Sequence, residues 1–257
     1  MSDAVVAPRP RPAISEALKE LFRRLFTRGT STFIIIFGRR ETGKTDFAFL
    51  ICEILYALGI VQHFATNTRV YSAPFPITRI TSLDELSRWS EQNSGRKVFI
   101  FDEMGKAYRR RTPMSSLNIK LIDKMQVLRK HKLSIIGIAP ADKYVDSASL
   151  GSDVLDAVFL KPNYKNPKVA LYQDVMDGTG KTIRDIPPTV VNFDQWDVAP
   201  FTERNMEKLP MFKDEDKALL WKWCQGATAK DLGLFPMQIN RKLRKFVKDV
   251  LEHEYNA

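Results

Sequence analysis

The sequence predicts an α/β protein whose central sheet is mostly parallel, followed by a small helical module. Short continuous apolar runs at residues 32–37 (TFIIIF), 97–102 (KVFIFD) and 133–139 (LSIIGIA) alternate with longer segments of helical periodicity. Consecutive apolar residues are typical of strands that are buried on both faces, as in parallel sheets covered by helices. A stretch rich in Pro and Asp at 186–205 breaks this pattern, and the segments after it have helical periodicity.

The first 29 residues are predicted to form a basic arm and an amphipathic helix. Residues 1–12 contain three prolines beside two arginines, a composition that excludes a helix there. From about residue 13 to Gly29, apolar side chains recur at three- and four-residue spacing, and basic side chains occupy another face. We expect this helix to pack against the following domain or a neighbouring subunit, and a position on a membrane surface is the alternative.

Residues 30–195 are predicted to form the sheet domain, and residues 196–257 a linker and a small helical domain. The other elements expected in the sheet domain are a helix at 44–59, a strand at 63–66, a helix from the capping box of Ser82 and Glu85 to about residue 92, a helix at 117–131, and strands at 154–161 and 168–176. Beyond the break, helices are expected at about 214–225, 228–233 and 236–253.

The composition limits the class of protein. Hydrophobic residues make up 44% and charged residues 27% of the 257 residues, as in ordinary globular proteins, which excludes a disordered chain. A net charge of +10 favours a polyanionic partner such as nucleic acid. Cys52 and Cys224 have no metal-ligand spacing. The longest apolar stretch, 47–61, is shorter than the roughly 20 residues of a membrane-spanning helix, and no signal peptide precedes it, so we expect a cytoplasmic protein.

A phosphate-binding loop is predicted directly after the first strand. Residues 38–45 read GRRETGKT and match the pattern G-x-x-x-x-G-K-[ST] at every required position. The glycines allow a tight turn whose backbone N–H groups point inward and form a nest for a polyphosphate. Lys44 brings a full charge to the β- and γ-phosphates, and the Thr45 hydroxyl is a ligand for Mg²⁺. The predicted nucleotide-binding residues are Gly38, Arg39, Arg40, Glu41, Thr42, Gly43, Lys44 and Thr45.

A second GTGKT occurs at residues 178–182, and we interpret it as a turn. Val175 stands where the leading glycine of the pattern would be, and the preceding residues have the pattern of a strand. The pair Asp177-Gly178 is a signal for a β-hairpin.

An acidic pair, Asp102 and Glu103, ends the strand at 97–102. In open α/β folds, the carboxyl ends of sheet strands are where ligands bind. Asp102 is therefore predicted to hold Mg²⁺ through a water molecule, and Glu103 to orient and deprotonate the water that attacks the γ-phosphate. Because no guanine-reading N-K-x-D motif occurs in the expected region, the loop and the acidic pair together predict an ATPase that depends on Mg²⁺.

These motifs together resemble a known superfamily. The segments FGRRETGKTDFAFLICEIL, FATN, KVFIFDEMGKAYRRR and MQVLRKHKLSIIGIAP look like the HerA/FtsK superfamily of P-loop ATPases, particularly the small ATPases of archaeal viruses and plasmids. The resemblance covers about residues 30–195 and implies a RecA-like core with added strands, in ring-forming and usually hexameric motors that thread DNA. A viral origin would add a virion-associated location and a capsid or membrane partner. The superfamily pattern places an amide sensor after the strand that here ends at Ala139, whereas this chain has Asp142 nearby and no amide.

A motor of this kind needs a positive charge, supplied by a neighbouring subunit, to stabilise the transition state of phosphoryl transfer. The candidates for this arginine finger are Arg129 and Arg110, with Arg109 and Arg111 beside the latter. The alternative is that these arginines lie in solvent or contact DNA phosphates, because basic runs after a strand commonly do.

The carboxyl-terminal segments have the spacing of a helix-turn-helix. A helix that includes residues 218–223 (ALLWKW) is followed by a short turn and by Pro236, which suits the first turn of the last helix. That helix has an apolar stripe for a core, and a three-helix module for protein docking is the alternative. The predicted DNA-contacting residues are Gln238, Asn240, Arg241, Arg244, Lys245 and Lys248.

Three functions are consistent with these features, and the third, membrane-linked extrusion of phage or plasmid DNA, rests on the amphipathic first helix alone. The leading hypothesis is a DNA translocase or genome-packaging motor that couples ATP hydrolysis to DNA movement and assembles as a ring of identical subunits. The alternative is an ATP-gated helix-turn-helix protein that binds DNA sites in replication, plasmid maintenance or transcription.

Overall fold

The computed structural model describes residues 13–104, 129–140, 155–162, 167–197 and 199–201, and the statements below concern these residues. They form three helices and ten strands: α1 (Glu16–Thr27), β1 (Phe33–Gly38), α2 (Lys44–Ala57), β2 (His63–Thr66), β3 (Val70–Ser72), β4 (Ile77–Arg79), α3 (Leu83–Gln92), β5 (Lys97–Phe101), β6 (Leu133–Ala139), β7 (Ala157–Lys161), β8 (Ala170–Asp174), β9 (Gly180–Ile183) and β10 (Asn192–Phe193).

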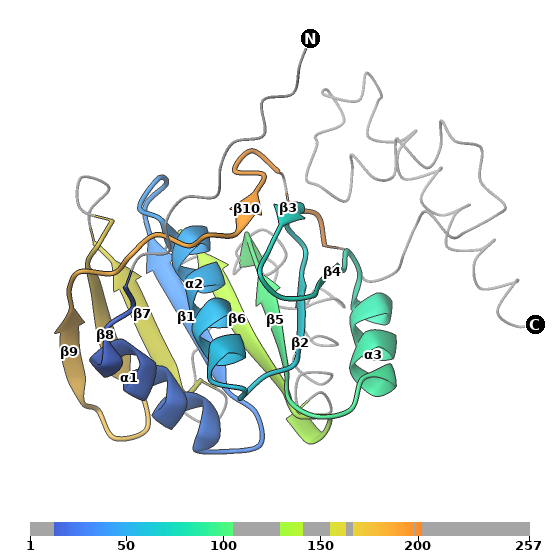
Figure 1. Ribbon diagram of the computed structural model, residues 1–257, viewed down its shortest axis with the longest axis horizontal. Helices are drawn as coiled ribbons and strands as arrows, with labels where there is room; N and C mark the ends of the chain where they lie inside the picture. The colour runs from blue at the N-terminus through green and yellow to red at the C-terminus, as the bar shows by residue number, and fades with distance from the viewer. Residues whose placement is uncertain (1–12, 105–128, 141–154, 163–166, 198, 202–257) are drawn as a thin grey trace, which may run out of the picture. The chain divides into compact units, whose positions relative to one another are not determined.

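The core of the molecule is an eight-stranded sheet with the strand order β4-β2-β5-β6-β1-β7-β8-β9. The strands from β4 to β7 pair in parallel, and β8 and β9 are added to one edge as an antiparallel hairpin (Figure 1). The strand β6 lies between β1 and β5, with Phe37 opposite Ala139 and Phe101 opposite Gly137. The α/β class with a mostly parallel sheet is therefore confirmed, and it is consistent with the RecA-like core that the resemblance implies.

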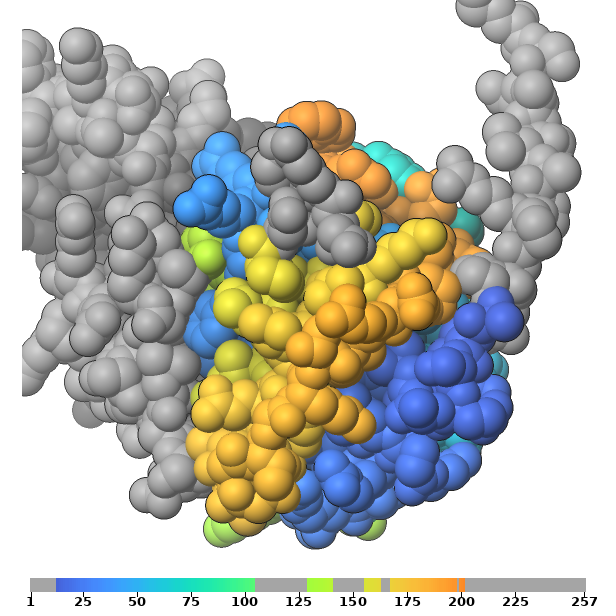
Figure 2. All heavy atoms as spheres, turned by 90° about the vertical axis from the view of Figure 1, so that its left-hand side faces the viewer, coloured from blue at the N-terminus to red at the C-terminus, as the bar shows by residue number. Residues whose placement is uncertain are grey.

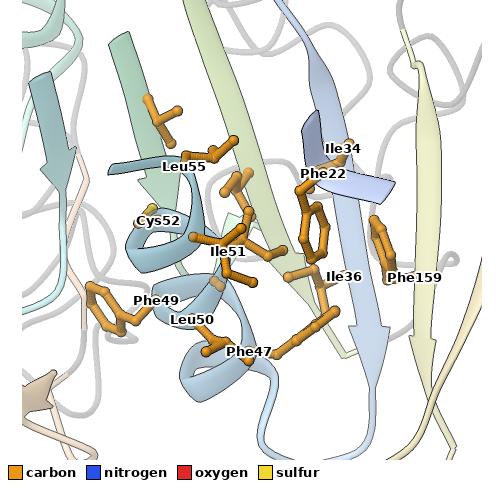
Figure 3. Packing of buried hydrophobic residues seen from close by; sticks show 14 of the residues in the cluster. Phe22, Ile34, Ile36, Phe47, Phe49, Leu50, Ile51, Cys52, Leu55 and Phe159 are labelled. Atoms are coloured by element: carbon orange, nitrogen blue, oxygen red, sulfur yellow. The ribbon is translucent and has the colours of Figure 1, made fainter. Parts of the chain in front are cut away.

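The sheet is buried on both faces, as the continuous apolar runs predict. Every residue of β1, β5 and β6 is buried. On one face, side chains of α1 and α2 pack on alternate strand residues, and Phe22, Phe47 and Phe159 meet with ring centroids 5.4–6.1 Å apart (Figure 3). On the other face, Leu83 and Leu86 of α3 pack on the intervening strand residues. A sheet covered on both faces leaves its edges and strand ends for function.

Helix α1 is part of this core. Ser15 caps its amino terminus by accepting a hydrogen bond from the Leu18 N–H at 3.3 Å. Its apolar stripe is fully used in packing, because Leu18, Leu21, Phe22, Leu25 and Phe26 are each at most 4% exposed. Figure 2 shows α1 (blue) lying against the region of β8 and β9 (yellow to orange). Packing against the following domain is thus the observed use of this helix. In the described part of the chain, no helix combines the length and the apolar character needed to cross a membrane.

Several elements agree with the sequence predictions and several were missed. The strands at 63–66 and 133–139 and the helix after Ser82 are confirmed, with Glu85 bonding to the Thr81 N–H at 3.0 Å. The short strands β3, β4 and β10 were not predicted, because runs of two or three residues have no detectable period. The second GTGKT contains the end of the predicted hairpin turn and also, unexpectedly, the start of β9. The helix predicted at 117–131 lies outside the described residues except at its end.

Residues 186–197 and 199–201, which we call the strap, pack on the sheet domain, although a linker was expected at 186–205. The strap runs from β9 across the outer side of α2 to β10, which pairs with β3 (Figure 1). Ile186, Val191 and Ala199 are each at most 6% exposed. The chain forms two compact units, Met1–Glu203 and Arg204–Ala257. The second unit, with its predicted helix-turn-helix, lies outside the described residues.

Candidate active site

The loop that joins β1 to α2 has the backbone of a phosphate nest. Gly43, in the left-handed region with a φ of 75°, precedes α2, and Glu41 has a φ of 62°. At Gly38 a side chain is excluded by close approach, since a Cβ there would lie 2.7 Å from the Lys161 carbonyl oxygen and 2.7 Å from Thr42 Oγ1. Non-glycine residues at positive φ cost energy and are concentrated at functional sites. Space therefore excludes a side chain at Gly38, whereas at Gly43 the left-handed backbone conformation favours glycine.

The loop and the acidic strand end meet at one edge of the sheet. Thr45 Oγ1 donates a hydrogen bond to Asp102 Oδ2 at 3.0 Å, across 57 residues of sequence. Because β1 and β5 run parallel on either side of β6, their carboxyl ends lie at the same edge (Figure 1). The structure thus brings together residues 38–45 and Asp102, which the sequence analysis expected to lie in one site.

Asp102 is held by several hydrogen bonds at this edge. Its Oδ1 accepts from the Glu103 N–H at 2.8 Å, and its Oδ2 also accepts from Thr68 Oγ1 at 3.4 Å. Burial raises the pKa of Asp102, and the hydrogen bonds from Glu103 and Thr45 oppose this shift. A carboxylate that has lost much of its hydration is the kind of group that a cation stabilises strongly.

Lys44 is directed back over the loop. Its Nζ donates to the Arg39 carbonyl oxygen at 2.7 Å, and Thr42 Oγ1 donates to the same oxygen at 2.9 Å. Burial lowers the pKa of Lys44, while the negative charges of Asp102 and Glu103 oppose this shift. Arg39, Arg40 and Glu41 are exposed at the surface of the loop. The Lys44 ammonium is thus close enough to Asp102 and Glu103 for their negative charges to act on it.

Glu103 follows Asp102 in a strained turn. Its φ is 53°, a conformation uncommon for a residue with a side chain, and its side chain is half-buried. The buried Met104 follows it, with its Sδ in the space next to Gly137 of β6. The turn fixes Glu103 at the edge of the sheet beside the Thr45–Asp102 pair.

The residues at this edge fit a Mg²⁺ ion and the phosphates of ATP. Mg²⁺ prefers oxygen ligands and is commonly bound by one or two protein oxygens together with substrate phosphates. The hydroxyl of Thr45 and the carboxylate of Asp102 supply such oxygens next to the loop, and the helix α2 points its amino terminus at the same place.

Not every predicted residue is brought to this site. Arg129 lies at the opposite, amino-terminal edge of the sheet, where its Nη2 is 3.8 Å from Asp156 Oδ2. Asp156 in turn accepts from the Phe33 N–H at 2.7 Å, at the start of β1. Arg110, Asp142 and the six predicted DNA-contacting residues lie outside the described residues. The role of Arg129 or Arg110 as an arginine finger stays a prediction.

Sequence reasoning missed the residues that support the site. Asn67, directly after β2, is fully buried and forms hydrogen bonds with the main chain of Asp102. An amide therefore lies at the site, but it follows β2 and not β6, after which the superfamily pattern places its sensor. The signal available was a polar residue at the carboxyl end of a buried strand. Asp46 and Glu53 on α2 hold the strap, which no sequence pattern indicated.

Lys161, at the end of β7, is a second buried cation beside the loop. It is 1% exposed, its Nζ donates to the Pro167 carbonyl oxygen, and it lies 5.3 Å from the centroid of the Phe47 ring. Burial lowers the pKa of Lys161 to about 8, with Asp46 opposing the shift, and burial raises the pKa of Asp46 to about 6. The end of β7 therefore supports the loop by pairing with Gly38, and the Lys161 ammonium is already bonded to a main-chain carbonyl.

Comparisons with known proteins give structural matches only. The sequence matches no protein-family model, and no curated protein matches it. The chain is similar to the genome packaging NTPase B204 from Sulfolobus turreted icosahedral virus 2 in complex with ATPγS, with a TM-score of 0.48, 12% identity, and coverage of 62% of this chain and 99% of that chain.

It is also similar to a protein described as an ATPase (TM-score 0.46, 10% identity, 70% of this chain and 96% of that chain) and to the N-terminal domain of zonular occludens toxin from Neisseria meningitidis (TM-score 0.42, 13% identity, 59% and 93%). A viral packaging NTPase and an ATPase are thus among the structures that this chain resembles, as the motifs indicated. All these TM-scores are below 0.5.

Proposed function

We propose that this protein is a Mg²⁺-dependent ATPase that moves DNA, as a translocase or a genome-packaging motor. The observation that supports the ATPase is the 3.0 Å hydrogen bond from Thr45 to Asp102, which joins the phosphate-binding loop to the acidic strand end. Phosphoryl transfer requires a loop that binds phosphates, a lysine, a hydroxyl and two carboxylates near one another. The loop, Lys44, Thr45, Asp102 and Glu103 provide these groups at one edge of the sheet.

In this proposal the chain's residues have distinct tasks. The backbone N–H groups of residues 38–45 bind the phosphates, and Lys44 leaves the Arg39 carbonyl to pair with the phosphate oxygens. Glu103 orients the attacking water and accepts its proton, and the effect of its negative charge on the pKa of Lys44 supports a position close to the loop.

Thr45 and Asp102 are the residues that would hold Mg²⁺. When bound, the ion would neutralise the negative charge that develops on the phosphate in the transition state. The hydrogen bond between these two residues holds both oxygens within 3.0 Å of each other beside the loop, so that little rearrangement is needed to bring them to one ion.

The DNA part of the proposal rests on charge. The chain has 40 basic and 30 acidic residues, and six polar or basic side chains are predicted on its last helix. A basic surface attracts the phosphate backbone without regard to sequence, which is what a motor that moves along DNA needs. A ring of subunits, usually six in the superfamily that the motifs resemble, would surround the DNA.

The variant Glu103→Gln tests the catalytic assignment. We expect it to bind ATPγS as tightly as the wild type and to lose at least about 100-fold in kcat, since removal of a general base typically costs 10²–10⁴-fold. Calorimetry measures the binding, and phosphate release with and without DNA measures the turnover. Lys44→Ala is the comparison variant, and it should lose the binding itself because the cation of the loop is gone.

DNA decides between the two functions. A motor shows ATP turnover that rises when DNA is added, with an affinity for DNA that falls steeply as salt increases and depends little on DNA sequence. Turnover that stays low with DNA, together with binding to particular DNA sites, would support the ATP-gated DNA-binding protein instead. Retained turnover in Glu103→Gln would refute the role of Glu103.

A further inference from the structure

The side chain of Asn67 connects the acidic strand end to the strap. Asn67 follows β2 directly, and β2 pairs in parallel with β5, so that Asn67 lies beside Asp102 at the sheet edge. Its side chain is fully buried. A buried amide has an acceptor oxygen and two N–H donors that must be satisfied, and here each partner can be identified.

The side-chain amide of Asn67 forms three hydrogen bonds, and all three are with main-chain atoms next to the site. Its Oδ1 accepts from the Asp102 N–H at 2.8 Å, and its Nδ2 donates to the Asp102 carbonyl oxygen at 3.0 Å. The same Nδ2 donates to the Ala199 carbonyl oxygen of the strap at 2.7 Å. One side chain therefore fixes both main-chain groups of Asp102, and the strap fixes that side chain.

The end of the strap also touches the residue before Asp102. The ring of Phe201 lies 4.6 Å from the ring of Phe101, measured between centroids, and 5.6 Å from that of Phe99. Ala199 has a φ of 47°, so the strap is bent at the point where it meets Asn67. The Asn67 amide thus holds the backbone of Asp102, and Phe201 of the strap packs on the preceding residue, Phe101.

The strap is anchored independently of the site. Asp197 accepts from the Arg69 N–H at 2.6 Å and forms an ion pair with Arg79 at 3.0 Å. Further back, Glu53 accepts from the Val190 N–H at 2.8 Å, and Phe193 packs on Phe49 with centroids 4.9 Å apart. Glu53 and Phe49 belong to α2, the helix that begins at the phosphate-binding loop.

We propose that Asn67 is a positioning residue for Asp102 and that the strap makes this positioning possible. The inference rests on the proposed ATPase function, because it concerns the carboxylate assigned to Mg²⁺. Loosening the strap moves the Ala199 carbonyl away from the amide, which then no longer holds the Asp102 backbone in the orientation that meets Thr45. The strap leads directly into residues 202–257, so it is also the covalent connection between that region and the ATP site.

The test compares Asn67→Ala with a matched control, Asn93→Ala. Asn93 also has an amide donor, bonded to the Trp89 carbonyl oxygen at 2.7 Å, but it lies at the end of α3, away from the site. The first measurement needs no nucleotide: deuterium exchange of the backbone N–H of Asp102, whose hydrogen-bond acceptor the Asn67→Ala substitution removes. We expect faster exchange in Asn67→Ala and unchanged exchange at this position in Asn93→Ala.

The second measurement separates positioning from a general loss of structure. Calorimetry with ATPγS in EDTA reports the phosphate-binding loop, and the gain in affinity on adding Mg²⁺ reports Asp102. We expect Asn67→Ala to keep the affinity in EDTA, to lose most of the gain with Mg²⁺, and to lose about 10- to 100-fold in kcat, as is usual when the partner of a metal ligand is removed.

The strap is tested with Asp197→Ala, which touches neither Asp102 nor the loop. We expect faster exchange at Asp102 and a lower kcat than in a control that removes an exposed ion pair on α1, Glu16→Ala. Unchanged exchange at Asp102 in Asp197→Ala would refute the role of the strap.

Unchanged exchange and kcat in Asn67→Ala would overturn the inference, and so would loss of ATPγS binding in EDTA, which would make Asn67 a purely structural residue. A wild-type protein that binds no ATPγS would refute the proposed function, and the exchange measurement would still decide the role of Asn67.

Discussion

At Gly38 the main chain of β1 passes so close to β7 that one methyl group decides whether the loop can form. In Gly38→Ala the new Cβ would lie 2.7 Å from the Lys161 carbonyl oxygen, which belongs to a sheet strand and cannot move away. We expect Gly38→Ala to destabilise the protein by about 1–3 kcal/mol, the usual cost of overpacking, and to weaken ATPγS binding. Urea denaturation and calorimetry measure the two effects.

The matched control for this prediction is Gly29→Ala, at an exposed position where the nearest atom to a Cβ is 3.6 Å away. It should change stability by no more than about 0.5 kcal/mol. Equal stability and equal ATPγS affinity in Gly38→Ala and the wild type would contradict the close approach of β1 and β7.

At the scale of elements, one ion pair fastens α1 to the added hairpin. Arg28, at the end of α1, donates to both carboxylate oxygens of Asp174 on β8, at 3.0 and 2.6 Å, and the Asp174 side chain is fully buried. These hydrogen bonds lower the pKa of Asp174 to about 2. The carboxylate of the unfolded chain has a pKa of about 3.9.

The sign of the pH dependence follows from these values. Above about pH 4, Asp174 is ionised in the folded and unfolded states, and the ion pair contributes fully to stability. As the pH falls toward about 2, the unfolded chain takes up the proton first, and the contribution is lost. We expect Asp174→Asn to cost about 2 kcal/mol at pH 7 and progressively less below pH 4, in urea denaturation at a series of pH values. A cost that stays constant from pH 7 to pH 3 would contradict this.

At the scale of the whole molecule, ATP hydrolysis by a ring would need a cation from the neighbouring subunit. Of the arginine candidates from the sequence, Arg110 is tested first, because Arg129 lies 3.8 Å from Asp156 at the far edge of the sheet. We expect Lys44→Ala and Arg110→Ala each to lose turnover when alone. Mixing them should restore part of it, because an intact loop in one subunit then meets an intact arginine in the next.

The measurement is phosphate release by the two variants, alone and mixed in equal amounts, with and without DNA. Sedimentation of each sample with ATP gives the number of subunits in the assembly. Mixed samples that assemble and yet remain as inactive as the separate variants would refute a finger at Arg110.

The sequence by itself determined the parallel sheet and the glycine-containing loop that follows its first strand. Apolar runs without alternation required burial on both faces, which fixed β1, β5 and β6 as central strands. The spacing of Gly38, Gly43, Lys44 and Thr45 reflects local backbone chemistry, and so it could be recognised from one stretch of eight residues. The hairpin signal at Asp177-Gly178 and the cap at Ser82 are local in the same way.

Only the tertiary structure decided what surrounds that core. Thr45 and Asp102 meet because the strands that precede them, β1 and β5, both pair in parallel with β6. Asn67 meets Asp102 and Ala199 because β2 and the strap end at the same edge. Contacts between residues 35 to 132 positions apart leave no period or spacing in the sequence. For the same physical reason, the strap was expected to be a linker, because its prolines and aspartates are typical of a loop. Its contacts with α2 and β3 are made with residues far away in the sequence.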